Sequence, residues 1–392
     1  MVPASTWLQN AGDGLTGSLL IIGASGRAAA ASAIRAGLRP FVIDLFADAD
    51  TRRLCDVLQC PLADYSQGFV ELAKQAPPGP WMYTGGLENH PDVVAAISTN
   101  RQLWGNGPDQ LATVRDPFRL SHLLGVNGLA HPEVRPTPKG LPSNQRWLRK
   151  PLAGSGGFGI SEANHKDQPS VAHYYQQFVP GRSMSALAFD QQTFGITEQL
   201  IGTSWLHAPL FRYAGNLGPF PIGKLDCNDV TQTAVRIGER LRLRGVYGID
   251  FVHDGDWANI IEVNPRYPAS SELYELAWGI EVLDWHRSAY WKSPRKPKAA
   301  SVPNLVVGKG IYYAAKTITF PATGPWMVSL ANCTDVWRIH DFADIPQPGT
   351  IIDAGQPVLT LFASAPSQEL CLQKMKQTAA GLDLLLGVPT PR

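Results

Sequence analysis

Short apolar runs alternate with segments of helical spacing in the N-terminal part of the chain. Ser18–Ile22 predicts a buried strand, and Pro40–Asp44 predicts a second one. Between them, Gly23–Arg27 predicts a tight turn and Ala28–Ala36 predicts a helix of small residues. Trp81–Thr84 predicts a later strand. A strand, a glycine turn, a helix and a second strand make one βαβ unit, so this part predicts a doubly wound α/β domain.

Farther along the chain, strand patterns are separated by glycine and proline turns. Arg146–Pro151 and Tyr174–Val179 predict strands, and Gly245–His253 with Trp257–Val263 predicts a strand pair joined by a turn. Residues 308–363 carry further short strand patterns. Helical spacing predicts helices at Pro91–Ile97, Asp116–Leu124, Thr231–Leu243, Leu273–Ala289 and Gln368–Leu386. The mixture indicates an α/β fold with α+β character in places.

Composition narrows the class of protein. Lys and Arg number 34 against 33 Asp and Glu, and this balance argues against a nucleic-acid partner, which a strong basic excess would indicate. No apolar run reaches about 18 residues, so no membrane-spanning helix is expected. The N-terminus lacks a signal-peptide pattern, and the five cysteines show no C-x-x-C spacing. A cytoplasmic protein is therefore expected.

A glycine-rich loop follows the predicted strand that carries Lys150. Its sequence is Gly154-Ser155-Gly156-Gly157-Phe158-Gly159, in which backbone N–H groups can approach phosphate oxygens while the lysine supplies positive charge. The loop does not match G-x-x-x-x-G-K-[ST], so a P-loop is excluded. A plain flexible turn explains the same residues, and the local sequence leaves both interpretations open.

Two carboxylates and an amide lie on the predicted strand pair. Asp250 belongs to a Gly-Ile-Asp-Phe segment, and Glu262, Asn264 and Arg266 belong to a Glu-Val-Asn-Pro-Arg segment. Residues two apart on a strand face the same side, where Asp250 of the adjacent strand can join them. Oxygen ligands suit Mg²⁺, and Arg266 suits a transferring phosphoryl group. Surface carboxylates are the alternative, but the surrounding Ile and Val residues predict burial, where unpaired charge is costly.

Taken in order, these elements resemble the ATP-grasp superfamily over residues 18–290. The resemblance implies the ATP-grasp fold and the binding of ATP with Mg²⁺, or with Mn²⁺ in its place. It implies that Lys150 and Arg266 are the catalytic charges and that the metal ligands are Asp250, Glu262 and Asn264. The nucleotide is then held by Lys150, Gly154, Ser155, Gly156 and Gly157, and by a hinge at Gln176, Gln177, Phe178 and Val179.

The resemblance also implies a division of the chain into four parts. They are a pre-ATP-grasp α/β domain at 18–110, a small subdomain with the lysine strand and glycine loop at 111–182, a large subdomain with the metal site at 183–292, and a β-rich closing region at 304–392. Residues 293–303 are basic and proline-rich and predict a linker.

The chain departs from the family pattern at two points. Many members carry a second nucleotide lysine before the lysine strand, where this chain has Arg115-Asp116-Pro117-Phe118-Arg119, so Arg119 or no residue takes that role. The hinge also lacks the acidic residue that often binds the ribose. Residues 344–349 and 355–358 resemble a branch likened to biotin carboxylase, whose members accompany pterin- and furan-type one-carbon cofactors.

The family resemblance implies a ligase that activates a substrate carboxylate as an acyl phosphate for attack by an amine. Its partners are then two small molecules, a carboxylate and an amine, for example in a glutamate ligase of cofactor biosynthesis. Bicarbonate as the acid is a variant of this reaction, and a homodimer is one option for the assembly.

Four further residues are candidates for the substrate site. Glu88 and Asn89 follow a predicted strand end, where open α/β sheets bind ligands, although a helix cap explains Glu88 equally well. Ser270 and Ser271 follow the metal strand. They either line the acceptor site or, in the case of Ser271, cap the next helix.

Two other functions stay open. Gly23-Ala24-Ser25-Gly26 with Asp44 imitates a dinucleotide fingerprint, which would make the chain an NAD(P)-dependent oxidoreductase, but position 28 is alanine where the fingerprint has its third glycine. The second alternative is a degenerate nucleotide-binding protein without catalysis. The complete metal set argues against it, and the missing lysine argues for it.

Overall fold

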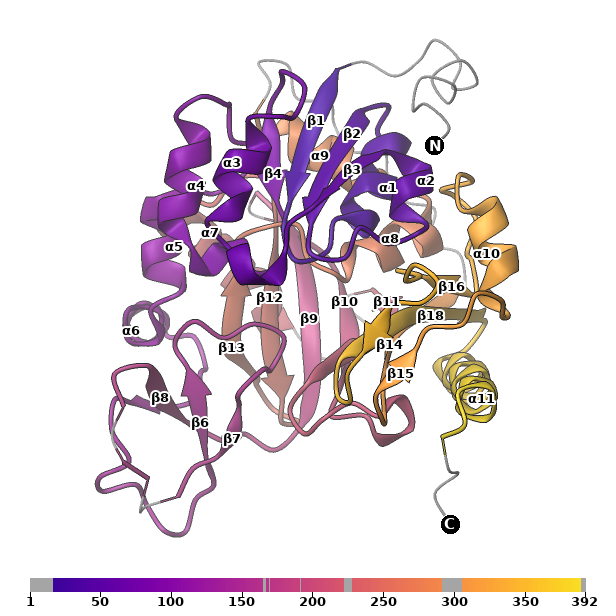
Figure 1. Ribbon diagram of the computed structural model, residues 1–392. Helices are drawn as coiled ribbons and strands as arrows, with labels where there is room; N and C mark the ends of the chain where they lie inside the picture. The colour runs from indigo at the N-terminus through magenta and orange to yellow at the C-terminus, as the bar shows by residue number, and fades with distance from the viewer. Residues whose placement is uncertain are drawn as a thin grey trace.

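Four β-sheets organise the part of the chain that the structure describes (Figure 1). This computed structural model describes residues 17–164, 167–168, 170–190, 192–221, 228–290 and 305–388. The linker predicted at 293–303 lies outside the described residues. Cys55, Cys60, Cys333 and Cys371 are free thiols, and Cys227 lies outside the described residues.

A parallel sheet with helices on both faces forms the N-terminal part. Its strand order is β3-β2-β1-β4. The strands are β1 (Ser18–Ile22), β2 (Arg39–Asp44), β3 (Asp56–Gln59) and β4 (Trp81–Tyr83). Leu19 and Ile21 share a core cluster with helix α1 (Arg27–Arg35), whereas Leu20 and Ile22 share one with helices α3 (Gly68–Ala73) and α4 (Pro91–Ser98). Alternate side chains of one strand therefore fill two cores, which confirms the predicted doubly wound unit.

A small antiparallel sheet carries the lysine strand. Its order is β5-β8-β6-β7, and helix α6 (Pro117–Val126) precedes it in the chain. Its strands are β5 (Val134–Arg135), β6 (Trp147–Pro151), β7 (Ser161–Glu162) and β8 (His173–Gln177). Helix α6 begins after Asp116, whose carboxylate accepts hydrogen bonds from the backbone N–H groups of Phe118 and Arg119.

The largest sheet has eight strands in the order β13-β12-β9-β10-β11-β14-β18-β16. Its first five strands in that order are β13 (Ala258–Asn264), β12 (Val246–His253), β9 (Arg182–Phe189), β10 (Gln192–Ile201) and β11 (Tyr213–Phe220). The remaining three are β14 (Val306–Tyr313), β18 (Pro357–Ala365) and β16 (Phe342–Ala343). One sheet thus continues from the large subdomain into the C-terminal region, and the four-part division of the chain stays a prediction.

Helix α11 (Gln368–Leu385) lies against β14 and β18 at the C-terminal end of this sheet (Figure 1). Further helices include α2 (Thr51–Leu54), α5 (Pro108–Val114), α7 (Asn228–Leu241), α10 (Trp326–Asn332) and the short 3₁₀ turns Leu62–Asp64, Leu87–Asn89 and Ser204–Leu206. Strands β15 (Ile318–Thr319) and β17 (Ile351–Ile352) form a two-stranded ribbon. None of the described helices is both long and apolar enough to cross a bilayer.

The single helix predicted at Leu273–Ala289 is wrong, because the structure has two helices there. Helix α8 (Ser271–Trp278) ends at Gly279, and helix α9 (Val282–Ser288) follows. Gly279 has φ 65°, a left-handed conformation that ends a helix readily when the residue is glycine. Both helices carry buried apolar residues at helical spacing, so the hydrophobic pattern continued across the break.

Candidate active site

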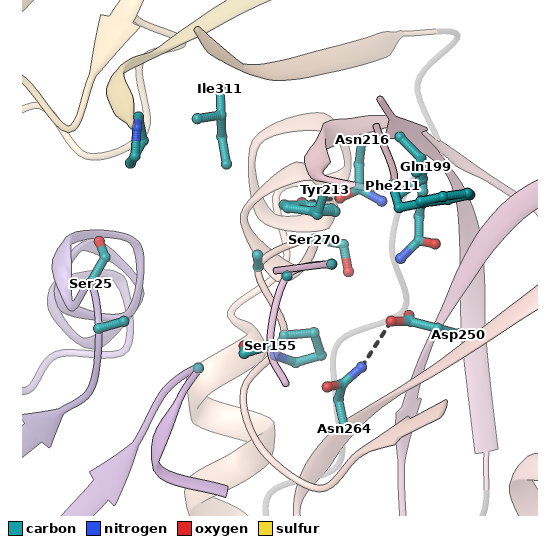
Figure 2. Close-up of a pocket in the computed structure, with 18 of the residues that line it drawn as sticks. Ser25, Ser155, Gln199, Phe211, Tyr213, Asn216, Asp250, Asn264, Ser270 and Ile311 are labelled. Atoms are coloured by element: carbon teal, nitrogen blue, oxygen red, sulfur yellow. Dashed lines mark hydrogen bonds between the residues drawn. The ribbon is translucent and has the colours of Figure 1, made fainter. Parts of the chain in front are cut away.

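A cavity of ≈ 1130 Å³ lies where all four sheets come together. Its walls come from the turn after β1, from the glycine-rich loop, and from strands that include β6, β8 to β14, β17 and β18. The predicted site residues in the lining are Lys150, Ser155, Gly156, Gly157, Gln176, Gln177, Phe178, Val179, Asp250, Glu262, Asn264, Arg266 and Ser270. Figure 2 shows Asp250, Asn264, Ser155 and Ser270 around this space.

The carboxylates of the predicted metal set belong to neighbouring strands. Asp250 of β12 is the register partner of Glu262 of β13, and Asn264 lies two residues farther along the same strand. The Asn264 amide donates to Asp250 Oδ2 over 2.9 Å, the contact drawn in Figure 2. Burial, and then the charge of Glu262, raises the pKa of Asp250 to about 6. A buried carboxylate whose pKa is raised by an adjacent carboxylate marks a place that attracts a cation.

Arg266 is held in place by the buried carboxylate of Glu88. Its Nε donates to Glu88 Oε1 over 2.9 Å, and its Nη2 donates to Asn264 Oδ1 over 3.1 Å. Glu88 is 1% exposed and is not part of the cavity lining. Burial opposes its ionisation, but the charges of Arg266 and Arg115 keep the pKa of Glu88 below its usual value. The capping role considered for Glu88 is wrong, because no side-chain cap bond starts the neighbouring helices.

Arg115 connects the glycine loop to strand β13, a role that no pattern in the sequence indicated. One of its guanidinium nitrogens pairs with Glu262 Oε1, and Nη2 donates to the Gly154 carbonyl over 2.7 Å. Nε donates to Asn89 Oδ1 over 2.9 Å, so Asn89 holds this arginine behind the cavity wall. Arg119 instead lies outside the cavity lining, with a 64% exposed side chain 3.4 Å from Asp116.

The lysine strand and the hinge meet across the small sheet. Lys150 Nζ of β6 donates to Gln176 Oε1 of β8 over 3.0 Å. Gln176 is buried, and Phe178 packs under the guanidinium of Arg146 at 4.2 Å from the ring centroid. Lys150 therefore faces the same space as the hinge backbone, as binding of the phosphates and adenine of one nucleotide would require.

The glycine-rich loop docks on the start of β11. Gly157 has φ 76°, and a Cβ at this position would lie 1.9 Å from the Phe211 carbonyl oxygen. The Gly156 carbonyl accepts a hydrogen bond from the Tyr213 N–H over 3.0 Å. Only glycine allows this approach at position 157, so the loop is a defined cover over the cavity rather than a plain turn.

The two candidate serines flank the start of helix α8. Ser270 is buried and lines the cavity. Ser271 does not line it; its hydroxyl is buried without a hydrogen-bond partner in the described part of the chain. The capping role considered for Ser271 is wrong, because the helix begins at Ser271 itself and has no side-chain cap.

In the turn that imitates a dinucleotide fingerprint, the acidic residue Asp44 accepts hydrogen bonds from backbone N–H groups of the protein itself. Asp44 is fully buried, and its Oδ2 accepts from the Gly26 N–H over 2.9 Å. Its Oδ1 accepts from the Ala47 N–H over 2.7 Å and from the Phe46 N–H over 3.1 Å. The carboxylate that would bind a ribose and the N–H group that would bind a pyrophosphate thus bind each other, which argues against an NAD(P) site here.

The donor set fits a hard divalent cation that shares its coordination with phosphate oxygens. The described residues contain no group of three or more His, Cys, Asp or Glu that could hold a metal alone. Asp250 and Glu262 supply carboxylate oxygens, and Asn264 supplies an amide oxygen. Mg²⁺ is commonly held by one or two carboxylates together with substrate phosphates, so two acids at the wall of a large cavity suit it.

The sequence was compared with models of protein families and with curated proteins, and both comparisons gave a match. Residues 115–270 match the sequence profile of the ATP-grasp domain family. An uncharacterised protein of Methanocaldococcus jannaschii is 24% identical over 277 residues. That match spans 66% of this chain and 63% of the relative, which is less than two thirds of the relative's length.

Solved structures of low sequence identity share the architecture. Biotin carboxylase of Campylobacter jejuni, in a complex with βγ-ATP, matches with a TM-score of 0.66 at 14% identity over 91% of this chain and 89% of that one. An L-amino acid ligase of Bacillus licheniformis matches with a TM-score of 0.63 at 15% identity over 93% and 97%. At these identities the likeness shows the fold: the chain has the ATP-grasp fold, and its residues 115–270 are the part that matches the ATP-grasp domain family.

Proposed function

We propose that the protein is an ATP-dependent ligase that converts a substrate carboxylate into an acyl phosphate, with release of ADP, for attack by an amine. The observation that carries the proposal is one shared cavity. Lys150 and the glycine loop lie on one wall, and Asp250, Glu262 and Arg266 lie on another. Groups suited to phosphates, to a metal ion and to a developing phosphoryl charge therefore face the same space.

In this proposal the protein supplies position and charge. Lys150 binds phosphate oxygens beneath the glycine loop, whose Gly156 and Gly157 exclude water from that side. Asp250, Glu262 and Asn264 would hold Mg²⁺, which supplies positive charge to the phosphates when bound. Arg266, fixed by Glu88 at 2.9 Å, presents its guanidinium to the phosphoryl group in transfer. Fixed charges of this kind lower the barrier because they need no reorganisation during the reaction.

The carboxylate and the amine are the finer part of the proposal. The likeness of residues 344–349 and 355–358 to a biotin-carboxylase-like branch supports a role in the biosynthesis of a pterin- or furan-type one-carbon cofactor. Glutamate is then a first substrate to test, either as the acid or as the amine. Solved relatives act on small molecules of different kinds, among them an L-amino acid ligase, so a panel of substrates is needed. Cytoplasmic location and a homodimer stay predictions.

The test measures ADP release from Mg-ATP across a panel of carboxylates and amines that includes glutamate and aromatic amines. We expect release that requires both an acid and an amine, together with calorimetric binding of Mg-ATP. Binding of Mg-ATP without release across the panel would favour the degenerate nucleotide-binding protein. Tight binding of NAD(H) without binding of ATP would contradict the proposal.

A further inference from the structure

The cavity has a second end, formed where the N-terminal sheet meets β14. In Figure 2, Ser25 of the turn after β1 lies across the space from Asp250. Asp48 of the loop after β2, Lys309 of β14 and Asp344 of the loop after β16 also line the cavity. Loops after the strands of a parallel sheet are where such sheets bind ligands.

Most charged groups at this end are satisfied by one another. Arg27 donates two hydrogen bonds to Glu272, of 2.6 and 2.8 Å, and a third of 2.7 Å to Asp344. Lys309 Nζ donates to Glu272 over 2.9 Å. Asp50 accepts from the Asp344 N–H over 2.8 Å. These contacts connect helix α1, helix α8 and the C-terminal strands. They also leave both Arg27 and Lys309 paired with carboxylates of the protein.

Asp48 is the exception. It is 6% exposed, and it lines the cavity. In the described ranges of the chain, no side chain and no backbone N–H group makes a hydrogen bond or an ion pair with its carboxylate. Buried carboxylates are normally paired, and this one opens onto the cavity, where a ligand can supply the partner.

The surrounding charge is negative. The carboxylates at this end are Asp44, Asp48, Asp50, Glu272 and Asp344, and the cations are Arg27 and Lys309. Burial, and then the charges of Asp50 and Asp344, raises the pKa of Asp48 well above its usual range. A positive group placed against Asp48 would offset both the burial and the repulsion.

We propose that this end of the cavity binds a positively charged organic group of the acceptor substrate, an ammonium or a guanidinium, against the carboxylate of Asp48. The inference deepens the proposed function and rests on it, because it names the class of molecule that reaches the ligase site. The described residues offer no cluster of three acidic, His or Cys ligands that could hold a metal ion without oxygens from a substrate. Phe46, Leu62 and Ile311 line the same cavity and provide apolar surface for the stem of an organic cation.

The test compares three probes of similar shape and different charge: butylamine, which is a cation at neutral pH, butanol and butyrate. Their binding to the full chain, saturated with Mg-ADP, is followed by ligand-observed NMR and calorimetry. We expect butylamine to bind at least about tenfold tighter than butanol and butyrate, and Asp48→Asn to remove that preference. Asp353 lines the same cavity but is exposed, so Asp353→Asn is the matched control and should retain the preference.

Two outcomes would overturn the inference: equal binding of the three probes by the wild type, or a cation preference that survives in Asp48→Asn. Thermal unfolding separates a ligand group from a structural one. A carboxylate without a partner repels its acidic neighbours, so Asp48→Asn should leave Tm unchanged or raise it, and a clear fall would contradict the inference. Binding of Mg-ADP is measured first, so a failure of the proposed function is seen independently of the probes.

Discussion

Two buried charge networks in this protein use the same residue types for different purposes. The site network joins Glu88, Arg266 and Asn264 at the cavity wall. The second network joins Arg35 of α1 to Glu275 of α8 over 2.6 Å, with Tyr267 Oη donating to the same carboxylate over 3.3 Å. Both bury an arginine and a glutamate. The ion pair of the first contributes Arg266 to the cavity lining, whereas neither Arg35 nor Glu275 lines the cavity.

The two regions differ in how many of the carboxylate oxygens accept hydrogen bonds from donors of the protein itself. Glu275 is fully buried, and fixed donors satisfy both of its oxygens, among them Arg35, the Ser32 hydroxyl and the Val282 N–H. Glu262 lines the cavity and keeps a side chain 34% exposed, with Arg115 as its ion-pair partner. A saturated network stabilises the fold, whereas an unsaturated one at a cavity can exchange its partner for a ligand. The comparison therefore predicts opposite consequences for similar substitutions.

The largest effect is expected for Glu262→Gln. A neutral amide weakens a site for Mg²⁺, so we expect ligase turnover to fall by about a thousandfold, equivalent to ~4 kcal/mol of barrier. Because Glu262 is partly exposed, Tm should change little. Steady-state ADP release and thermal unfolding are measured on the same preparation. Turnover close to the wild-type rate would show that the metal assignment is wrong.

Glu275→Gln should do the reverse. Removal of one partner of a buried ion pair leaves the charge of Arg35 uncompensated, so we expect the free energy of unfolding to fall by about 3 kcal/mol. Turnover of the folded fraction should stay close to the wild type, because Glu275 does not line the cavity. Denaturant unfolding and ADP release at a temperature where the variant is folded check the two parts. A loss of turnover without a loss of stability would place Glu275 in the site network instead.

A buried histidine makes the stability of the fold depend on pH. His286 Nδ1 accepts from the Val246 N–H over 3.0 Å, and Nε2 donates to the Trp104 carbonyl over 2.9 Å. Burial lowers the pKa of His286 to about 4. The unfolded chain, with a histidine pKa of about 6.5, then binds more protons than the folded chain between these values. This contribution to stability is complete above pH 6.5 and is lost as the pH falls towards 4.

We expect a loss of about 2 kcal/mol between pH 7 and pH 5 from His286, at about 1.4 kcal/mol for each pH unit. His286→Asn keeps an acceptor near the Val246 N–H but does not titrate, so it provides the control. The free energy of unfolding of the wild type should fall more steeply over this range than that of the variant. Parallel curves would mean that His286 takes up its proton in the folded state as readily as in the unfolded state.

Local patterns predicted the features whose parts lie close in sequence. The apolar run Ser18–Ile22 is strand β1, residue for residue. Asp250, Glu262 and Asn264 line one cavity because the two-residue period of a strand and a short turn are enough to bring them together. The helix break at Gly279 was missed, because a lone glycine inside a helical pattern does not by itself predict a left-handed residue.

Local patterns could not predict the contacts between residues that lie far apart in the sequence. Arg115 and Glu262 are separated by 147 positions in the chain, and no spacing rule connects them. No sequence pattern predicted a role for Asp48, because its position depends on how the sheets enclose the cavity. The helix cap at Asp116 could have been used to predict different surroundings for the two arginines on either side of it. Arg115 precedes the cap and points back to the sheet, whereas Arg119 lies in the exposed first turn of α6.

The smallest expected effect compares these two arginines directly. Arg115 holds the Gly154 carbonyl at 2.7 Å and pairs with Glu262, so Arg115→Met should loosen the loop and weaken Mg-ADP binding by about tenfold, or ~1.4 kcal/mol. Arg119→Met removes the same charge four positions away but loses only an exposed ion pair, which contributes little. Calorimetric titration of both variants measures the difference. If Arg119→Met weakened binding and Arg115→Met did not, the exposed arginine would take the role of the second nucleotide lysine, and the link from the loop to the metal strand would be structural.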